Sequence, residues 1–481
     1  MTVSIRWIYR VVLFFTLIGL IGMEMPVRVA AAVDHMEEAE ERKSIPIESN
    51  SYVNWPAGPV IGAESAILME ANSGTILYEK NINERLYPAS ITKLLTALVA
   101  VDNSELDEMV TFSEEAVHSI NWYNDANIGI SPGNSITMEQ CLYGLLVGSA
   151  NEVAYAIAEH VSGNVDDFVD LMNKKAEELG CTNSHFVTTN GIHDPEHYTS
   201  AHDMALIAKA FFSNEMLAGM SCTTTYHIPQ SDTQPRDDMI VYAKSKLHKG
   251  KEYAYEGLVG TKTGYTDYAR QTLVSCAKRN NLKLICVILK EEAPYQYTDT
   301  IELFNYGFDN FKSYNIADND KTYMVKEADF MASGESFFDS DKLEIEIDDR
   351  DYVVVPVNVD FDDLTSEISY EDVKDTEIAH VYYYFGDIEV GRSIIRLKDN
   401  ASVTYDFGYK SSSTLREPQE KIWTVNIIEV LLIVIGAGLL VTMLVLFKNR
   451  MAAGRIERRR RKNSRKYDIN GTAHLDWKHF K

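Results

Sequence analysis

Residues Tyr87–Ala97 read YPASITKLLTA, and this stretch decides how the rest of the chain is interpreted. After Pro88, apolar residues recur at helical spacing from Ser90 to about Val101. Ser90 and Lys93 are three residues apart, so they lie on one face of the expected helix, one turn apart. A desolvated lysine close to other cations has a lowered pKa and can accept the proton of a serine hydroxyl. The stretch therefore predicts a serine nucleophile, Ser90, with Lys93 as its general base.

A serine and a lysine at this spacing are a weak signal alone, because an exposed lysine on a helix gives the same pattern. Ser149-Ala150-Asn151 stands between two helical runs, in CLYGLLVGSANEVAYAIAEH. Lys262-Thr263-Gly264 opens a strand region, in GLVGTKTGYTDYARQTLVSCA. Taken separately, the first tripeptide is typical of a helix N-cap and the second of a surface turn. In the order SxxK, SxN, KTG, they form the motif set of penicillin-binding proteins and class A β-lactamases.

From about Ala63 to Phe311 the chain resembles the D-alanyl-D-alanine carboxypeptidases of the low-molecular-mass penicillin-binding type, serine peptidase family S11. The resemblance includes LLVGSANEVAYAIAEHVSG, HFVTTNGIHDPEHYTSAHDMALIAKA and KTGYT. It implies an α/β (α+β) catalytic domain of the β-lactamase/transpeptidase-like fold. It also implies that the terminal D-alanine of peptidoglycan pentapeptides is removed through an acyl-serine intermediate, with β-lactams as inhibitors and no cofactor.

The resemblance also implies roles for individual residues. Ser90 would be acylated, Lys93 would be the base, and Ser149 would relay protons. The substrate-binding group would comprise Asn151, Lys262, Thr263, Gly264 and Tyr265. Asn151 would hold the substrate amide, and Lys262 with Thr263 would contact the terminal carboxylate. Backbone N–H groups of Ser90 and Tyr265 would form the oxyanion hole.

Two departures from the family pattern concern carboxylate recognition. Ala269-Arg270 stands where members often have Ala-Gly after KTG-x-T, and Gln296 stands where an arginine commonly precedes an aromatic residue. Because guanidinium pairs bidentately with carboxylate, we hypothesise that Arg270 replaces the absent arginine as substrate anchor. An exposed strand arginine is an equally good interpretation.

Between the two ends of the chain, the spacing of apolar residues predicts an antiparallel sheet with an inserted block of helices. A hairpin is expected over 65–70 and 75–78, helices over 137–147, 150–161, 166–179 and 202–212, an antiparallel pair around 279–281, and a closing helix over 298–311. The expected organisation is a signal peptide at 1–32, a spacer at 33–58, the catalytic domain at 59–312, a small all-β domain at 320–410, a linker at 411–422, a transmembrane helix at 423–447 and a basic tail at 448–481.

The two ends of the chain predict export followed by C-terminal anchoring. Arg6 and Arg10 precede an apolar region that ends near Ala30-Ala31-Ala32, which is typical of a cleaved signal peptide; an uncleaved anchor is the alternative. The run 423–447 is long enough to span a bilayer as a helix. Residues 448–481 hold twelve Lys or Arg and three Asp or Glu, so the positive-inside rule places this tail in the cytoplasm and the catalytic domain outside.

The sequence offers less support for nucleic-acid binding, a metal site or a cysteine-based site. The net charge of -25 argues against a nucleic-acid partner, and the basic run Arg458–Lys462 is typical of a topology signal or a contact with anionic lipid. His193, Asp194, His197 and His202 lack the HExxH spacing of a metal site. The five cysteines form no CxxC pair.

Two functional alternatives stay open: a serine β-lactamase, with Glu215 as a loose candidate for deacylation, and a catalytically weak, anchored wall-binding protein.

Overall fold

The structure is a computed structural model that describes residues 35–320 except 238, residue 322, and residues 345–371, 373–374 and 377–397. The predicted signal peptide, linker, membrane span and basic tail lie outside these residues. Within the described ranges, no helix combines the length and the apolar character needed to cross a bilayer.

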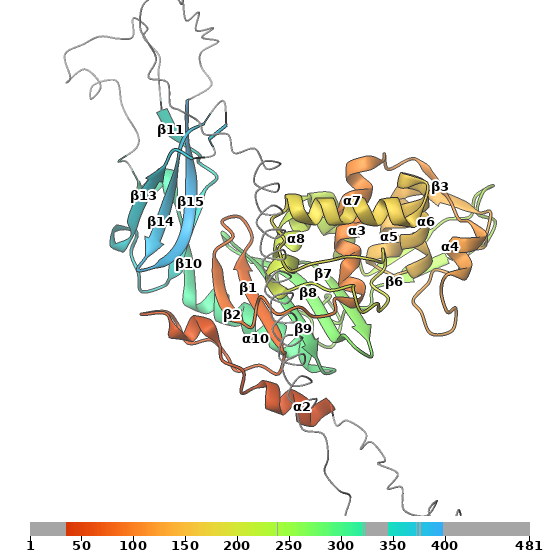
Figure 1. Ribbon diagram of the computed structural model, residues 1–481, viewed down its shortest axis with the longest axis horizontal. Coiled ribbons are helices and arrows are strands. Elements are labelled where there is room, and N and C mark those ends of the chain that lie inside the picture. Colours follow the sequence, from red (N-terminus) through yellow and green to blue (C-terminus); the bar gives the residue numbers. More distant parts are fainter. Residues whose placement is uncertain are drawn as a thin grey trace, which may run out of the picture. The chain divides into compact units, whose positions relative to one another are not determined.

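A five-stranded antiparallel sheet forms the centre of the catalytic part (Figure 1). Its strand order is β2-β1-β9-β8-β7, and the strands are β1 (Ser65–Glu70), β2 (Ile76–Lys80), β7 (Leu258–Thr266), β8 (Arg270–Arg279) and β9 (Leu282–Glu291). Both predicted hairpins are confirmed: Leu68 pairs with Tyr78, and Arg279 pairs with Leu282 across the turn. The strand that carries the KTG motif, β7, is an edge strand.

The sheet is buried on both faces, which explains why β9 reads as a continuous apolar run. Ile285, Val287 and Leu289 belong to the core cluster that contains the helical block. Leu284, Cys286 and Ile288 belong to a second cluster with the closing helix α10 (Tyr295–Asn310). Successive side chains of a strand point to opposite faces, so one strand serves both cores.

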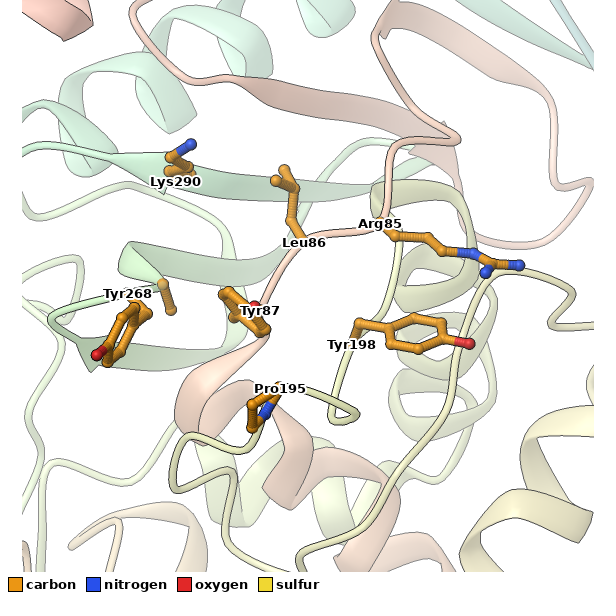
Figure 2. A pocket seen from close by; sticks show the side chains of 8 residues that line it. Arg85, Leu86, Tyr87, Pro195, Tyr198, Tyr268 and Lys290 are labelled. Carbon is orange, nitrogen blue, oxygen red and sulfur yellow. The ribbon is translucent and has the colours of Figure 1, made fainter.

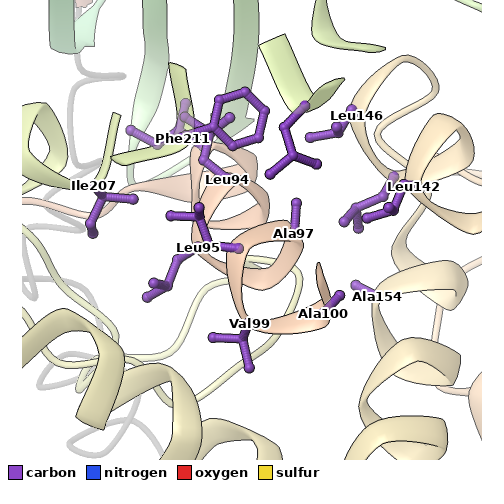
Figure 3. Packing of buried hydrophobic residues seen from close by; sticks show 14 of the residues in the cluster. Leu94, Leu95, Ala97, Val99, Ala100, Leu142, Leu146, Ala154, Ile207 and Phe211 are labelled. Carbon is purple, nitrogen blue, oxygen red and sulfur yellow. The ribbon is translucent and has the colours of Figure 1, made fainter. Parts of the chain in front are cut away.

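The helical block lies between β2 and β7 in the chain and packs around α3 (Lys93–Asn103). The other helices are α4 (Glu114–His118), α5 (Met138–Leu146), α6 (Asn151–Ser162), α7 (Val165–Glu178), α8 (Ala201–Ser213) and α9 (Glu215–Ser221). Figure 3 shows Leu94, Leu95 and Ala97 of α3 facing α5 and α8. Because α3 is buried around most of its circumference, the residues at its N-terminus are held rigidly.

The sequence patterns located the long helices to within a few residues but missed the shorter elements. Two small antiparallel pairs, β3 (Met109–Thr111) with β4 (Ser135–Thr137) and β5 (Thr225–Ile228) with β6 (Met239–Tyr242), were not predicted. Strands of three or four residues contain too few positions to establish a period of two.

The segment predicted to be a spacer is partly structured. Residues His35–Arg42 form α2, and Glu48–Ser51 form a 3-10 turn, η1. Trp55 is 8% exposed and donates a hydrogen bond to the Leu77 carbonyl (3.0 Å), while Arg42 is 7% exposed and binds the Gly62 carbonyl (3.0 Å). The acidic composition did not reveal these contacts, and the spacer boundary at 58 stays a prediction.

The acidic region after the closing helix is rich in strands. A four-stranded sheet has the order β11-β15-β14-β13, and β10 pairs with β12. The elements are β10 (Phe311–Asn315), α11 (Ile316–Asn319), β11 (Ile345–Ile347), β12 (Tyr352–Pro356), η4 (Phe361–Asp363), β13 (Thr365–Ser369), β14 (Glu377–Phe385) and β15 (Ile388–Leu397). Val353 and Val381 share a core cluster with Phe304 of α10. Whether residues 320–410 form a domain of their own stays a prediction.

Candidate active site

Ser90 lies in a single 3-10 turn, η2 (Ala89–Thr92), that precedes α3. The expectation of an α-helix beginning at Ser90 is therefore corrected: the α-helix begins at Lys93. In a 3-10 turn, side chains three residues apart eclipse each other. Lys93 Nζ consequently lies directly against the nucleophile, 2.9 Å from Ser90 Oγ.

The turn before Ser90 has a strained backbone that its neighbours hold in place. Ala89 adopts a φ of 51°, a left-handed conformation that costs energy for any residue with a β-carbon. Its carbonyl accepts a hydrogen bond from Thr92 Oγ1 at 2.8 Å. A β-carbon at Gly191 would overlap that same carbonyl, so glycine is required there. Thr272 Oγ1 of β8 binds the Pro88 carbonyl at 2.8 Å and ties the turn to the sheet.

The imidazole of His197 supports the same turn. Its Nδ1 accepts the backbone N–H of Val187 at 3.0 Å, so the proton of the neutral ring is on Nε2. Nε2 lies 2.9 Å from Thr92 Oγ1 and donates to it, which leaves the hydroxyl proton of Thr92 for the Ala89 carbonyl. Burial lowers the pKa of His197 to about 3, so the ring stays neutral.

Lys93 is fully buried and has three oxygen neighbours. Besides Ser90 Oγ, its Nζ lies 2.7 Å from Asn151 Oδ1 and 2.5 Å from the Asn190 carbonyl. Burial lowers the pKa of Lys93 well below its ordinary value, and the positive charge of Lys262 lowers it further. This environment favours the neutral amine, whose lone pair can accept the proton of the Ser90 hydroxyl.

The second motif lies in the tight connection between α5 and α6. Ser149 has a φ of 60°, another strained position, and is 6% exposed. Asn151 is the first residue of α6, and its backbone N–H donates to the Ala126 carbonyl at 2.8 Å. This connection directs Asn151 toward Lys93, and Ser149 toward the strand with the third motif.

The third motif lies on β7, beside the nucleophile. Lys262 Nζ donates to Ser149 Oγ at 2.9 Å and to the Thr263 carbonyl at 2.7 Å. Burial, with help from the charge of Lys244, lowers the pKa of Lys262 to about 7. A β-carbon on Gly264 would lie 2.9 Å from the backbone nitrogen of Ser90, so glycine lets the edge strand approach the nucleophile closely.

Tyr265 and Arg270 occupy the end of the same hairpin. The tyrosine is 49% exposed, and its hydroxyl donates to Asp267 at 3.0 Å. Arg270 is bound by Glu292 through two nitrogens, with Nε–Oε1 at 2.9 Å and Nη2–Oε2 at 2.7 Å. Gln296 is buried and binds Gln271 at 3.1 Å. The guanidinium fork of Arg270 is therefore engaged by the protein itself, which favours a structural role, and the carboxylate-anchor hypothesis stays a prediction.

Two groups near Lys93 were missed by the sequence interpretation. The Asn190 carbonyl belongs to the backbone, and a backbone group leaves no side-chain signal in a sequence. Glu152 follows Asn151 on α6 and is fully buried, where its Oε1 accepts the backbone N–H of Ile128 at 2.7 Å. Burial raises the pKa of Glu152 to about 7. An acidic residue in the first turn of a helix is common, so nothing in the sequence singles out Glu152.

The residues weighed for other chemistries lie apart from this cluster. Within the described ranges, no group of three or more His, Cys, Asp or Glu side chains has metal-binding geometry. His193 is stacked on Tyr268 at 3.9 Å between ring centroids, while His197 supports the nucleophile turn. Glu215, the candidate for deacylation, is exposed in the first turn of α9 and forms no hydrogen bond with Ser90, Lys93 or Ser149.

Comparisons with known proteins agree with this geometry. Residues 52–293 match the family model described as D-alanyl-D-alanine carboxypeptidase, family S11. The chain is 33% identical over 266 residues to the D-alanyl-D-alanine carboxypeptidase DacF of Bacillus subtilis, covering 54% of this chain and 66%, just under two thirds, of that protein. It is 32% identical over 269 residues to DacB2 of Mycobacterium tuberculosis, covering 54% of this chain and 87% of that protein.

Solved structures establish the fold. Penicillin binding protein 5 from Haemophilus influenzae superimposes with a TM-score of 0.56 at 24% identity, covering 71% of this chain and 98% of that one. Penicillin binding protein 6B from Escherichia coli gives 0.52 at 21% identity, with coverages of 71% and 97%. The penicillin-binding, transpeptidase-like α/β fold with an antiparallel sheet is thereby confirmed.

Proposed function

The chain belongs to the D-alanyl-D-alanine carboxypeptidase family, peptidase family S11, and from this premise we propose that it is a serine-type D-Ala-D-Ala carboxypeptidase. Its substrate is the pentapeptide stem of peptidoglycan, from which it removes the terminal D-alanine. The observation that carries the proposal is the hydrogen bond between Lys93 Nζ and Ser90 Oγ, made by a buried lysine whose pKa burial lowers well below its ordinary value.

Acylation begins with the transfer of the Ser90 hydroxyl proton to neutral Lys93 while Ser90 Oγ attacks the carbonyl of the D-Ala-D-Ala bond. The negative charge that develops on the carbonyl oxygen is stabilised by the backbone N–H groups of Ser90 and Tyr265. The close approach of Gly264 to the backbone of Ser90 supports this pairing. Asn151 holds Lys93 in place during the transfer.

Expulsion of the terminal D-alanine requires a proton for its nitrogen. Ser149 is hydrogen-bonded to Lys262 and stands ready to relay that proton. Lys262 and Thr263 bind the carboxylate of the leaving residue, for which a cation and a hydroxyl are suitable partners. Water then hydrolyses the acyl-serine ester, with Lys93 again acting as base. A β-lactam acylates Ser90 by the same route.

The proposal is tested by incubating the purified full-length protein with diacetyl-Lys-D-Ala-D-Ala and, separately, with a fluorescent penicillin. We expect release of D-alanine and a stable acyl-enzyme, both abolished in Ser90→Ala. Rapid turnover of penicillin without release of D-alanine would identify a β-lactamase. The absence of both reactions would leave a wall-binding protein that only retains the motifs.

We further propose that the chain is exported and anchored, with its catalytic part outside the cell membrane and residues 320–410 forming a small β domain. Support comes from the apolar region after Arg10, the apolar run 423–447 and the basic tail that follows it. Mass spectrometry of the mature N-terminus should find it near Val33. Proteolysis of intact spheroplasts should remove the catalytic part and spare an epitope fused to Lys481.

A further inference from the structure

A cavity of about 240 Å³ opens beside the segment that leads into the nucleophile turn. Its lining comes from four places in the fold: the chain before Ser90, the loop before α8, the hairpin end between β7 and β8, and Lys290 near the end of β9. The lining residues are Arg85, Leu86, Tyr87, Pro195, Tyr198, Tyr268, Ala269 and Lys290. Figure 2 shows Tyr87 beside Tyr268 on one wall and Arg85 extending over Tyr198 on another.

The polar groups of this cavity suit an anion. Arg85 is exposed, its guanidinium lies 4.9 Å from the centre of the Tyr198 ring, and it forms no ion pair with any described residue. The hydroxyls of Tyr87, Tyr198 and Tyr268 likewise have no hydrogen-bond partner within the described part of the chain. No lining residue is acidic, and Glu64, which lies outside the lining, pairs with Lys290 at 2.5 Å. One free cation, with the Tyr198 hydroxyl beside it, thus borders a space whose lining has no acidic residue, while the Tyr268 hydroxyl lies on the opposite side (Figure 2).

Part of the cavity wall is held in place by neighbouring rings and backbone hydrogen bonds. His193 stacks on Tyr268 at 3.9 Å between ring centroids and meets Tyr87 edge-on at 4.6 Å, so three rings pack as a unit. The Leu86 backbone is hydrogen-bonded in both directions to Thr199, at 2.7 and 2.9 Å. A preformed site avoids the cost of ordering side chains when the ligand binds.

The cavity lies near the end of β7, the strand that carries Lys262 and Thr263. Lys262 and Thr263 come before Gly264 on β7, and Gly264 faces Ser90. Tyr268 comes after Gly264 in the chain, just beyond the end of the strand. Because β7 is an edge strand, an extended peptide can lie along it as an added strand. A peptide with its terminal carboxylate at Lys262 and its scissile bond at Ser90 then runs upstream toward Tyr268. Two residues of an extended chain cover about 7 Å.

We propose that this cavity is a subsite for a carboxylate that the substrate peptide carries at least two residues upstream of the scissile bond, with Arg85 as its main cation. This inference rests on the proposed carboxypeptidase function and specifies which peptides that function prefers. The hydroxyl of Tyr198, whose ring lies under the Arg85 guanidinium, donates a further hydrogen bond to the carboxylate. The subsite discriminates between an acidic residue and its amide at this one position.

The test compares acetyl-Glu-Lys-D-Ala-D-Ala with acetyl-Gln-Lys-D-Ala-D-Ala, and uses diacetyl-Lys-D-Ala-D-Ala as a substrate too short to reach the cavity. We expect kcat/KM to be about fivefold higher for the Glu peptide, the size of effect that a partly exposed ion pair produces. Arg85→Gln should abolish this preference while leaving the short peptide and the penicillin reaction unchanged. Arg392→Gln is the matched control, since Arg392 also lies over a tyrosine ring, Tyr382, at 5.8 Å.

Equal kcat/KM for the two long peptides in the wild-type protein would overturn the proposal, and so would a preference that persists in Arg85→Gln. Failure of the carboxypeptidase function is distinguishable, because the short peptide would then release no D-alanine either. In that case, calorimetric titration of Ser90→Ala with the same two long peptides decides the matter. Tighter binding of the Glu peptide that is lost in Ser90→Ala/Arg85→Gln supports the subsite, and equal binding refutes it.

Discussion

Ser90 and Lys93 are stacked by one 3-10 turn, and their reacting atoms are 2.9 Å apart. In an α-helix, residues three apart are offset around the axis, whereas a 3-10 turn with three residues per turn aligns them. The amine therefore reaches the hydroxyl without a swing of its side chain. This alignment depends on the left-handed backbone at Ala89, so the geometry of the turn is part of the catalytic apparatus.

Gly191→Ala should disable acylation while the protein remains folded. The new β-carbon overlaps the Ala89 carbonyl and pushes the turn that carries Ser90. Because a misplacement of about 1 Å can cost a hundredfold in rate, we expect a ten- to hundredfold slower reaction with penicillin, measured by stopped-flow fluorescence. Gly133→Ala is the control, since Gly133 has a similar φ of 78° but nothing within 4 Å of the added carbon. Equal rates in the two variants would contradict the role of the turn.

The pH profile of kcat/KM should be bell-shaped, with the pKa of Lys93 setting its acidic limb and the pKa of Lys262 its alkaline limb. Activity rises with pH as Lys93 loses its proton, at a pH far below the usual range for lysine because its pKa is lowered. It falls above about pH 7 as Lys262, whose pKa is about 7, loses the charge that binds the substrate carboxylate. Lys262→Arg should move only the alkaline fall to higher pH, since a guanidinium stays protonated. An unchanged alkaline limb would show that another group is responsible.

Arg270→Ala should destabilise the fold more than it changes catalysis. Glu292 is 5% exposed, and removal of Arg270 leaves Arg42, whose Nη2 lies 3.7 Å away, as its remaining ion-pair partner among the described residues. A buried charge that loses its partner costs about 3 kcal/mol, which urea unfolding can measure. Arg270→Ala/Glu292→Gln should recover much of this loss. If kcat/KM for the short peptide falls while stability is retained, the carboxylate-anchor hypothesis is the better one.

Stability should decrease from pH 6 to pH 9 because of the buried carboxyl pair Glu291 and Asp299. Burial and the neighbouring Glu291 raise the pKa of Asp299, so the folded protein keeps a proton that the unfolded chain releases. The stabilisation is complete at low pH and disappears as pH rises through the folded-state pKa. Asp299→Asn mimics the protonated form, so its thermal midpoint should vary less over this range. A parallel pH dependence in both proteins would exclude the pair as its source.

The sequence was sufficient to select the candidate catalytic side chains because each of the three motifs carries a distinct pattern in its expected context. Ser90, Lys93, Asn151 and Lys262 converge as the motif order predicted. The strands and helices with a clear period of two or of three to four residues were also predictable. Features that depend on the backbone were not. The Asn190 carbonyl beside Lys93 and the left-handed residues Ala89 and Ser149 have no residue-type signature.

The N-terminal segment shows a second limit of structure prediction from the sequence. Residues 35–58 have a polar, acidic composition, and composition alone predicted a spacer. Side chains of this segment nevertheless dock it onto the catalytic part: Arg42 and Trp55 donate hydrogen bonds to carbonyls, and Tyr52 donates one to Glu79. Irregularly spaced anchors do not produce a periodic pattern, so sequence periodicity cannot detect them.

The most direct test of the central claim is the acylation rate of Lys93→Ala with a fluorescent penicillin, measured beside the wild-type protein at pH 7. Loss of the general base should slow acylation by about a thousandfold. Circular dichroism and a thermal melt should confirm that the variant is folded. Acylation of folded Lys93→Ala at the wild-type rate would contradict the account, because Lys93 would then not be the base that activates Ser90.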